Sequence, residues 1–348
     1  MVTFILLIIV VNFLFLLLYK NGLDATYSKF SFFILYLALV LIVGLRGEGV
    51  DHDYTTYLIS ITKNETISEP TYLIISLLIS SFNLPTVLLF LLYAILGIGI
   101  KLYVIDKYSK LPIIAILIYL CNFLLLHDIN QIRAGVASAF ILLSVPFLAQ
   151  KERFKFCLCI ISATLFHFSS FIAFILLFIT NNKLSRVTYL IWFILPILGL
   201  GIHLISLDII SFIPIDSVRS KLEMYKYLEE IGTEGFAQAN LFNLYFLFKL
   251  FIYYFFLFKY CYYKEDGRLF NIYLKIYGIS LFLFPSLSSI TPLLGYRTSE
   301  LIGIIEILLF PYLFTIFKTK NQAKCMVVLY VILLFSINIF YKRLIFLS

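Results

Sequence analysis

The sequence predicts an all-α protein that crosses a membrane many times. Of its 348 residues, 62% are hydrophobic and only 13% are charged, whereas soluble proteins average about 45–50% and about 25%. Apolar runs of about 17–25 residues, the length that a helix needs to cross a bilayer, recur along the whole chain. We therefore expect about 10–12 transmembrane helices in a single membrane domain over 1–348, with no soluble domain.

The apolar runs give the positions of the expected helices. The first run lacks a basic start and a small-residue cleavage site, so we expect a retained helix and not a secretory signal. Two stretches are ambiguous, because 71–82 is short for a crossing and 154–180 is long for one helix. We expect a broken helix or a hairpin at 154–180. The other expected spans are 2–19, 29–45, 85–105, 112–127, 130–149, 187–206, 241–262, 269–290, 297–317 and 325–345.

The basic residues choose an orientation for these helices. If the N-terminus lies outside, 71–82 does not cross and 154–180 enters and returns, then 16 of the 27 Lys and Arg residues lie inside. This bias follows the positive-inside rule and places the two longest loops, 46–70 and 207–240, outside. The net charge of +8 is scattered over helix ends and does not indicate nucleic acid.

The cysteines do not indicate a redox or metal function. All five lie in apolar runs and none forms a Cys-x-x-Cys pair. This pattern suggests neither a metal site nor a disulfide framework. We expect a protein without a cofactor or a metal ion.

A first polar cluster follows the second expected span. Arg46 ends the span, glycines allow a tight turn, and Asp51, Asp53 and Tyr57 follow within twelve residues. The alternative is a solvated loop with an Arg that extends its charge to the membrane surface. The density of functional groups at one helix exit favours a binding or catalytic site.

The second and third clusters lie at other helix ends. Gln131 and Arg133 occupy the first turn of the span at 130–149. A charged side chain at membrane depth needs a partner or water, so Arg133 is a functional candidate or an interfacial Arg bonded to Asp128. His167 lies inside an apolar run and could be a packing residue. Its place at the expected bend favours function, because non-helical backbone at membrane depth usually lines a cavity.

A fourth cluster comes late in the chain. Arg297 and Glu300 are three residues apart and share a helix face, which also suits a local ion pair. In the chosen orientation the arginines at 46, 133 and 297 all reach the outer side. They would repel one another unless an anion lay among them, and Arg suits a phosphate because its planar donors hold two oxygens. A lipid diphosphate would provide this anion.

These clusters resemble the motifs of the Wzy-type polysaccharide polymerases, especially their EpsG-like branch. That branch has an Arg followed by Gly-x-Asp and a Tyr, an Ile-Arg near a helix start before small residues, a Phe-His-x-Ser, and a late Arg before an apolar helix. The resemblance covers 46–300, most of the chain. The matching residues are Arg46, Gly49, Asp51 and Tyr57; Ile132, Arg133, Ala134 and Gly135; Phe166, His167 and Ser169; and Arg297.

The resemblance implies a GT-C-like glycosyltransferase in the bacterial inner membrane, with its active site facing the periplasm. It implies the joining of undecaprenyl-diphosphate-linked repeat units into O-antigen or another polysaccharide, as in lipopolysaccharide biosynthesis. The expected partners are these repeat units, membrane lipids and a chain-length regulator protein.

Such a reaction assigns roles to the candidate residues. The departing diphosphate needs positive charge, for which Arg133 and Arg297 are the first candidates and Arg46 the third. The incoming hydroxyl needs a base, and His167, Asp51 and Asp53 are the candidates. The expected sugar contacts are Tyr57, Gln131 and Glu300.

Other functions remain open at this point. An O-antigen ligase would use the same donor with lipid A core as acceptor. A flippase or transporter of lipid-linked sugars would need a central cavity that opens to both sides, whereas the polar residues here cluster towards one face. A non-catalytic scaffold would leave the arginines unexplained.

Overall fold

The described part of the chain consists of helices and contains no strand. The structure, a computed structural model, describes residues 29–63, 67–205, 216–231, 240–260, 267–317 and 319–345. Within these ranges seven helices are long and apolar enough to cross a membrane, and three shorter apolar helices accompany them. This confirms the predicted all-α polytopic membrane protein. The expected span at 2–19 lies outside the described residues.

The chain divides into two compact units. Unit 1 comprises the residues up to Phe174 together with 306–348, and unit 2 comprises Ile175–Ile305. Unit 1 contains α2 (Lys29–Gly44), α3 (Tyr54–Lys63), α4 (Pro70–Ser81), α5 (Val87–Tyr108), α6 (Pro112–Ile118), the π-helix η1 (Tyr119–Asn130), α7 (Ile132–Ala149), α8 (Arg153–Phe166), α14 (Glu306–Leu309), the 3₁₀-helix η4 (Phe310–Tyr312), α15 (Leu313–Ile316), α16 (Lys320–Ser336) and a second π-helix, η5 (Ile337–Tyr341).

Unit 2 is built around α12. It contains α9 (Arg186–Ile205), α10 (Asp216–Glu230), α11 (Leu244–Tyr260), α12 (Arg268–Ser288) and α13 (Pro292–Gly303). Helix α12 packs against α9, α11 and α13, and 89% of its apolar 18-residue stretch is buried. By contrast, only 11% of the corresponding stretch of α9 is buried. An exposed apolar helix of this length suits a bilayer, where lipid covers its side chains.

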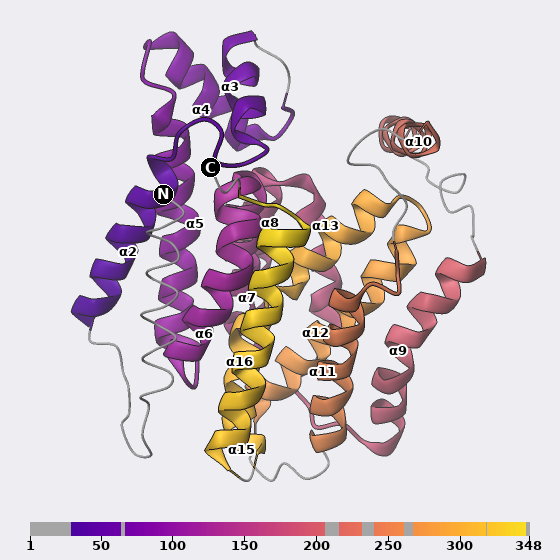
Figure 1. The fold of residues 1–348 in the computed structure, drawn as a ribbon. Coiled ribbons are helices and arrows are strands. Elements are labelled where there is room, and N and C mark those ends of the chain that lie inside the picture. Colours follow the sequence, from indigo (N-terminus) through magenta and orange to yellow (C-terminus); the bar gives the residue numbers. More distant parts are fainter. Residues whose placement is uncertain are drawn as a thin grey trace. The chain divides into compact units, whose positions relative to one another are not determined.

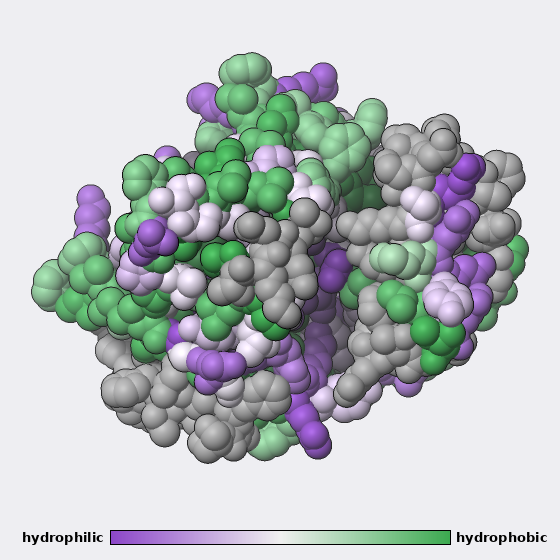
Figure 2. Space-filling model, turned by 90° about the horizontal axis from the view of Figure 1, so that it is seen from above, coloured by the Kyte–Doolittle hydropathy of each residue, from purple (hydrophilic) through white to green (hydrophobic). Residues whose placement is uncertain are grey.

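The core of unit 1 is the continuous span formed by α6 and η1. This span is 94% buried, because α5, α7, α14 and α16 pack around it. Helix α2 lies at the outside and exposes large apolar side chains such as Phe30 and Phe33. An exposed apolar helix face of this kind is stable in lipid and unfavourable in water. The surface seen from above carries both hydrophobic and hydrophilic residues (Figure 2).

The helix break predicted within 154–180 is confirmed. Helix α8 ends at Phe166, His167 has an extended backbone with φ −155° and ψ 115°, and the 3₁₀-helix η2 (Phe168–Phe178) follows. The chain therefore leaves the α-helix at the residue that the sequence singled out as a candidate base.

Helices α3 and α4 lie at one end of unit 1, and the turn from α15 to α16 lies at the opposite end (Figure 1). Helix α4 has 12 residues and is therefore about 18 Å long, which is too short to cross a bilayer. The segment between α2 and α4 lies at this end and carries the first candidate site residues.

Candidate functional site

The loop after α2 is organised by a buried ion pair. Arg46 Nε donates to Asp51 Oδ2 at 2.7 Å, and neither side chain has any exposed surface. Arg46 Nη1 also donates to the carbonyl of Val43 at 2.9 Å. Between the two charged residues, Gly49 has a φ of +78°, a conformation that few side chains tolerate. The predicted tight turn is present, and the ion pair between Arg46 and Asp51 joins its two ends.

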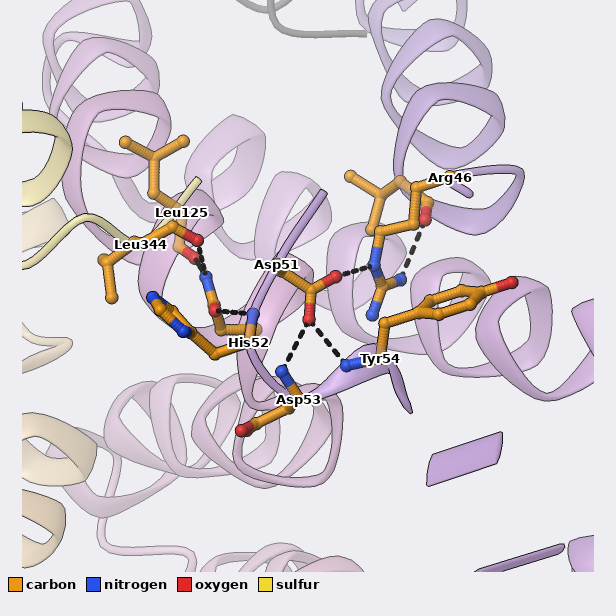
Figure 3. Close-up of polar contacts among 9 residues, drawn as sticks. Arg46, Asp51, His52, Asp53, Tyr54, Leu125 and Leu344 are labelled. Atoms are coloured by element: carbon orange, nitrogen blue, oxygen red, sulfur yellow. Dashed lines mark hydrogen bonds and ion pairs between the residues drawn. The ribbon is translucent and has the colours of Figure 1, made fainter. Parts of the chain in front are cut away.

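The same carboxylate starts the next helix. Asp51 Oδ1 accepts hydrogen bonds from the backbone N–H groups of Asp53 at 3.0 Å and Tyr54 at 2.9 Å, as Figure 3 shows. These are groups that the first turn of α3 cannot satisfy, so Asp51 acts like an N-cap. Both oxygens of Asp51 are thus occupied. The predicted role of Asp51 as a base and of Arg46 as a diphosphate ligand would require this pair to open.

Aromatic rings cover Arg46. Its guanidinium carbon lies 4.5 Å from the ring centre of Phe90, and the ring of Tyr54 stacks on Phe90 at 4.5 Å. A cation over a ring face is attracted by the ring's negative quadrupole, and burial strengthens this attraction. The geometry therefore favours a structural role for Arg46, which anchors the loop to α5.

A second polar cluster joins three distant parts of unit 1. Glu69, the residue before α4, accepts a hydrogen bond from Arg133 Nη1 at 2.5 Å through Oε2. Its other oxygen, Oε1, lies 3.1 Å from His167 Nδ1. Glu69 and His167 are 5% and 7% exposed, while the Arg133 side chain is 23% exposed. The structure thus brings Arg133 and His167 to one carboxylate, as their predicted convergence requires.

Glu69 is the site residue that the sequence analysis missed. It was one of several acidic residues in the loop 46–70, and its separation from Arg133 and His167 by 64 and 98 residues gave no sign of contact. The available signal was local, since Glu69-Pro70 directly precedes an apolar helix. Proline is common at the first position of a helix, so a carboxylate before it is placed at a helix start.

The alternative partner for Arg133 is engaged elsewhere. Asp128 binds Lys101 Nζ at 2.7 Å through each of its carboxylate oxygens and accepts from Tyr119 Oη at 2.9 Å. Lys101 is 0% exposed and Asp128 is 3% exposed. The alternative reading, in which Arg133 was bonded to Asp128, was therefore wrong. Buried charges at this depth require such pairing.

Tyr57 forms an aromatic wall beside Arg133. Its ring centre lies 5.7 Å from the Arg133 guanidinium carbon and 5.9 Å from the ring of Tyr72. Tyr72 in turn shares a hydrogen bond with Ser60 and donates to the Tyr57 carbonyl at 3.2 Å. Tyr57 is only 3% exposed, so its ring supports the Arg133 guanidinium.

The environment sets the charges of the cluster. Burial raises the pKa of Glu69, but the hydrogen bond with His167 and the charge of Arg133 outweigh burial and lower this pKa to about 2. Burial raises the pKa of Tyr57 to about 12, although Arg133 opposes the shift. At neutral pH the site therefore holds an ionised Glu69 and a neutral Tyr57.

The remaining predicted residues lie at the edges of these clusters or in unit 2. Asp53 and Gln131 are half-buried, and the backbone N–H of Gln131 donates to the carbonyl of Leu126. Arg297 is half-buried in α13, and Glu300 is 8% exposed. Because Arg297 and Glu300 belong to unit 2, their membership of the site stays a prediction. Within the described ranges, no three His, Cys, Asp or Glu side chains are grouped as a metal site.

Comparisons with known proteins identify a family and a similar protein for this chain. The sequence model of the EpsG family matches residues 29–346. The chain is also similar to the amylovoran biosynthesis protein AmsC of Erwinia amylovora. The two are 24% identical over 331 residues, which cover 90% of this chain and 84% of that protein. No solved structure matches the chain.

Proposed function

The chain belongs to the EpsG family, and on this premise we propose that it is a polysaccharide polymerase of the membrane. It joins oligosaccharide repeat units that are carried on undecaprenyl diphosphate, at the outer face of the bacterial inner membrane. The similarity to an amylovoran biosynthesis protein supports the polysaccharide product. The observation that carries the proposal is the Glu69 carboxylate, which holds a cation and a potential base at one place.

The proposed reaction needs only these two functions from the protein. The bond between the anomeric carbon and the diphosphate oxygen breaks, and the acceptor hydroxyl oxygen forms a new bond to that carbon. The hydroxyl proton passes to a base, and the bond electrons leave with the lipid diphosphate. Catalysis then consists of stabilising the developing negative charge and removing the proton.

His167 is the proposed base. Glu69 lies at hydrogen-bond distance from Nδ1, and a carboxylate at that nitrogen favours the tautomer with the proton on Nδ1. Nε2 then carries the lone pair that accepts the hydroxyl proton. When the ring becomes positively charged, the ionised Glu69 stabilises it, in the manner of an acid that orients a catalytic histidine.

Arg133 is the proposed ligand of the departing diphosphate. One terminal nitrogen binds Glu69, and the side chain is 23% exposed, which leaves an approach for an oxygen of the substrate. The planar guanidinium can hold two phosphate oxygens at once. Arg297 is the proposed second ligand, and Gln131, Tyr57 and Glu300 are proposed sugar contacts.

The buried Arg46–Asp51 pair is proposed to act indirectly. It fixes the loop between α2 and α3, and α3 carries Tyr57 beside Arg133. Asp53, half-buried in the same loop, remains an alternative base.

The test is chain extension by purified protein supplied with synthetic undecaprenyl-diphosphate-linked repeat units. Arg133→Lys and His167→Gln should each slow extension about 100-fold or more, while Arg153→Lys, an exposed change on α8, should not. Wild-type protein that forms no glycosidic bond would contradict the proposal. Transfer only to lipid A core would indicate a ligase, and movement of the lipid without transfer would indicate a flippase.

A further inference from the structure

Asn130 lies at the junction of three segments of unit 1. It is the last residue of η1, three residues before Arg133, and is 4% exposed. Its amide nitrogen donates to the carbonyls of Leu125 and Leu344, both at 2.8 Å. Its amide oxygen lies 3.4 Å from the backbone nitrogen of His52, which donates to it. Figure 3 shows Leu125, Leu344 and His52 beside the loop that carries Asp51.

A second contact closes the same junction. The ring nitrogen Nε2 of His52 lies 2.8 Å from the carbonyl oxygen of Arg343. The segment after η5 is shaped for this contact, because Arg343 has a φ of +49° and the N–H of Leu344 donates to the carbonyl of Asn338. Ile345 is then buried at 2% exposure. Residues 342–345 thus lie against the Asp51 loop instead of continuing the helix.

The junction joins two π-helices. The turns of η1 and η5 follow the i→i+5 pattern, and π-helical turns are frequent at functional sites. Two asparagine side chains add hydrogen bonds to carbonyls of η1: Asn130 binds that of Leu125, and Asn338 binds that of Cys121 at 2.9 Å. Asn338 also donates to the side-chain oxygen of Asn122. Only the first of these two asparagines reaches the Asp51 loop in the contacts described above.

We infer that Asn130 is a positioning residue, which sets the place of the Asp51 loop relative to the start of α7. One amide binds the loop, the end of η1 and the segment after η5, and α7 begins two residues later with Arg133 in its first turn. The inference rests on the proposed function only for its effect on catalysis. The requirement for asparagine follows from its chemistry, since it supplies two N–H donors and one acceptor. Aspartate has the same shape and lacks both donors.

The first test does not depend on any enzymatic activity. Hydrogen–deuterium exchange is measured in detergent for peptides that cover 46–57, in wild type, Asn130→Ala and Asn130→Asp. We expect exchange in this peptide to become about 10-fold faster or more, because the loop loses its attachment. Asn338→Ala is the matched control, since it is as deeply buried and binds η1. It should leave the peptide unchanged.

His52→Ala gives a second route if the Asn130 variants do not fold, because His52 is exposed. It removes the contact with Arg343. Exchange should become faster in the peptide that covers 46–57 and also in the peptide that covers 338–345. Unchanged exchange in the Asn130 variants, or an equal change in Asn338→Ala, would overturn the inference. So would unchanged exchange in His52→Ala if the Asn130 variants fail to fold.

The second test measures chain extension per folded molecule. Asn130→Ala should lower kcat about 10- to 100-fold, and His52→Ala should lower it in the same direction. Adding His52→Ala to Asn130→Ala should cost less than the product of the two effects, because both changes release one loop. Wild-type kcat in a folded Asn130→Ala protein would overturn the inference. A wild type without activity would contradict the proposed function alone, and the exchange result would still decide the position of the loop.

Discussion

Glu69 is the shared partner of Arg133 and His167. The sequence indicated these two candidates but not the carboxylate between them. Arg133 and His167 stood out because ionisable groups are rare in apolar runs, and the structure brings both to one carboxylate. Glu69 lay in a loop with several other acidic residues. A single sequence carries no signal for contacts across 64 and 98 residues, so the partner that these two candidate residues share could only be found in three dimensions.

Arg46 and Asp51 show a second limit of prediction from sequence, because a pattern that indicates a binding site can also be a structural ion pair. Their types and spacing indicated a functional site, and the predicted turn between them exists. However, their charges pair with each other and both side chains are fully buried. Five residues of separation is compatible with binding a substrate and with binding each other. Only burial distinguishes these two cases, and burial depends on packing by Phe90 from another helix.

Glu69→Gln should slow chain extension on the order of 100-fold. The amide keeps the size of the side chain but cannot stabilise a positively charged His167. Because the pKa of Glu69 is about 2, the wild-type carboxylate is ionised throughout the neutral range. The variant therefore replaces an ionised carboxylate by a neutral amide, and the defect is measured at pH 8 as initial rates per folded protein. A wild-type rate in the folded variant would contradict the assigned role.

The same variant should change acid stability. A depressed pKa contributes stability above the unfolded value, about 4.5, and this contribution is lost as pH falls through about 2. The difference in Tm between wild type and Glu69→Gln should thus shrink between pH 4.5 and pH 2. Thermal unfolding in detergent measures it. A difference in Tm that grows over this range would mean that Glu69 is not stabilised as an anion.

The Lys101–Asp128 pair gives a separate test of buried charge. Lys101→Met should destabilise unit 1 by about 3–5 kcal/mol, because it leaves the Asp128 carboxyl buried without its cation. Lys101→Met with Asp128→Asn should recover part of this loss, since neither charge then remains buried. Thermal unfolding of both variants, compared with wild type, measures the effect. Equal stability of the single and the double variant would show that the pair is not the main source of the loss.

At the scale of helices the sequence was informative about positions and less so about helix type. Expected spans at 187–206 and 269–290 correspond closely to α9 and α12, because apolar length fixes where a helix can cross. The break at His167 was also predicted. The π-helices η1 and η5 were not, because apolar length does not distinguish an i→i+5 from an i→i+4 hydrogen-bond pattern.

Both ends of helix α4 should lie on the outer side of the membrane. At 12 residues it is too short to cross, and the loop before it carries Glu69. In a background without native cysteines, Ser68→Cys and Ser81→Cys should both react with an impermeant maleimide added outside intact cells, and Lys320→Cys should not. All three positions are exposed. Labelling of position 320 without position 68 would reverse the orientation, and labelling of only one end of α4 would make it a crossing.

At the scale of the whole molecule, the predicted convergence of charges divides between two units. Arg46, Asp51, Arg133 and His167 belong to unit 1, whereas Arg297 and Glu300 belong to unit 2. The sequence identified these groups by their position at helix ends, and a common outer side followed from counting charges. Within unit 1, contacts support part of this convergence. Whether Arg297 and Glu300 of unit 2 act on the same substrate is a question for a kinetic test.

A double-mutant cycle between Arg133 and Arg297 provides this test. Lysine keeps the charge but cannot hold two phosphate oxygens in the plane of a guanidinium. Arg133→Lys and Arg297→Lys should each slow extension about 100- to 1000-fold if they hold the departing diphosphate. Residues that act on one group are not additive. The double variant should therefore lose less activity than the product of the two single losses.

The measurement is kcat for chain extension, normalised to folded protein, with the exposed Arg153→Lys as control. Losses that multiply would mean that the two arginines act on separate groups or separate steps. A wild-type rate in Arg297→Lys would confine the diphosphate site to unit 1. Unchanged binding of the lipid-linked unit together with a lower kcat would show that the arginines act mainly on charge that develops as the diphosphate departs, because interactions of equal strength in the ground and transition states do not change kcat.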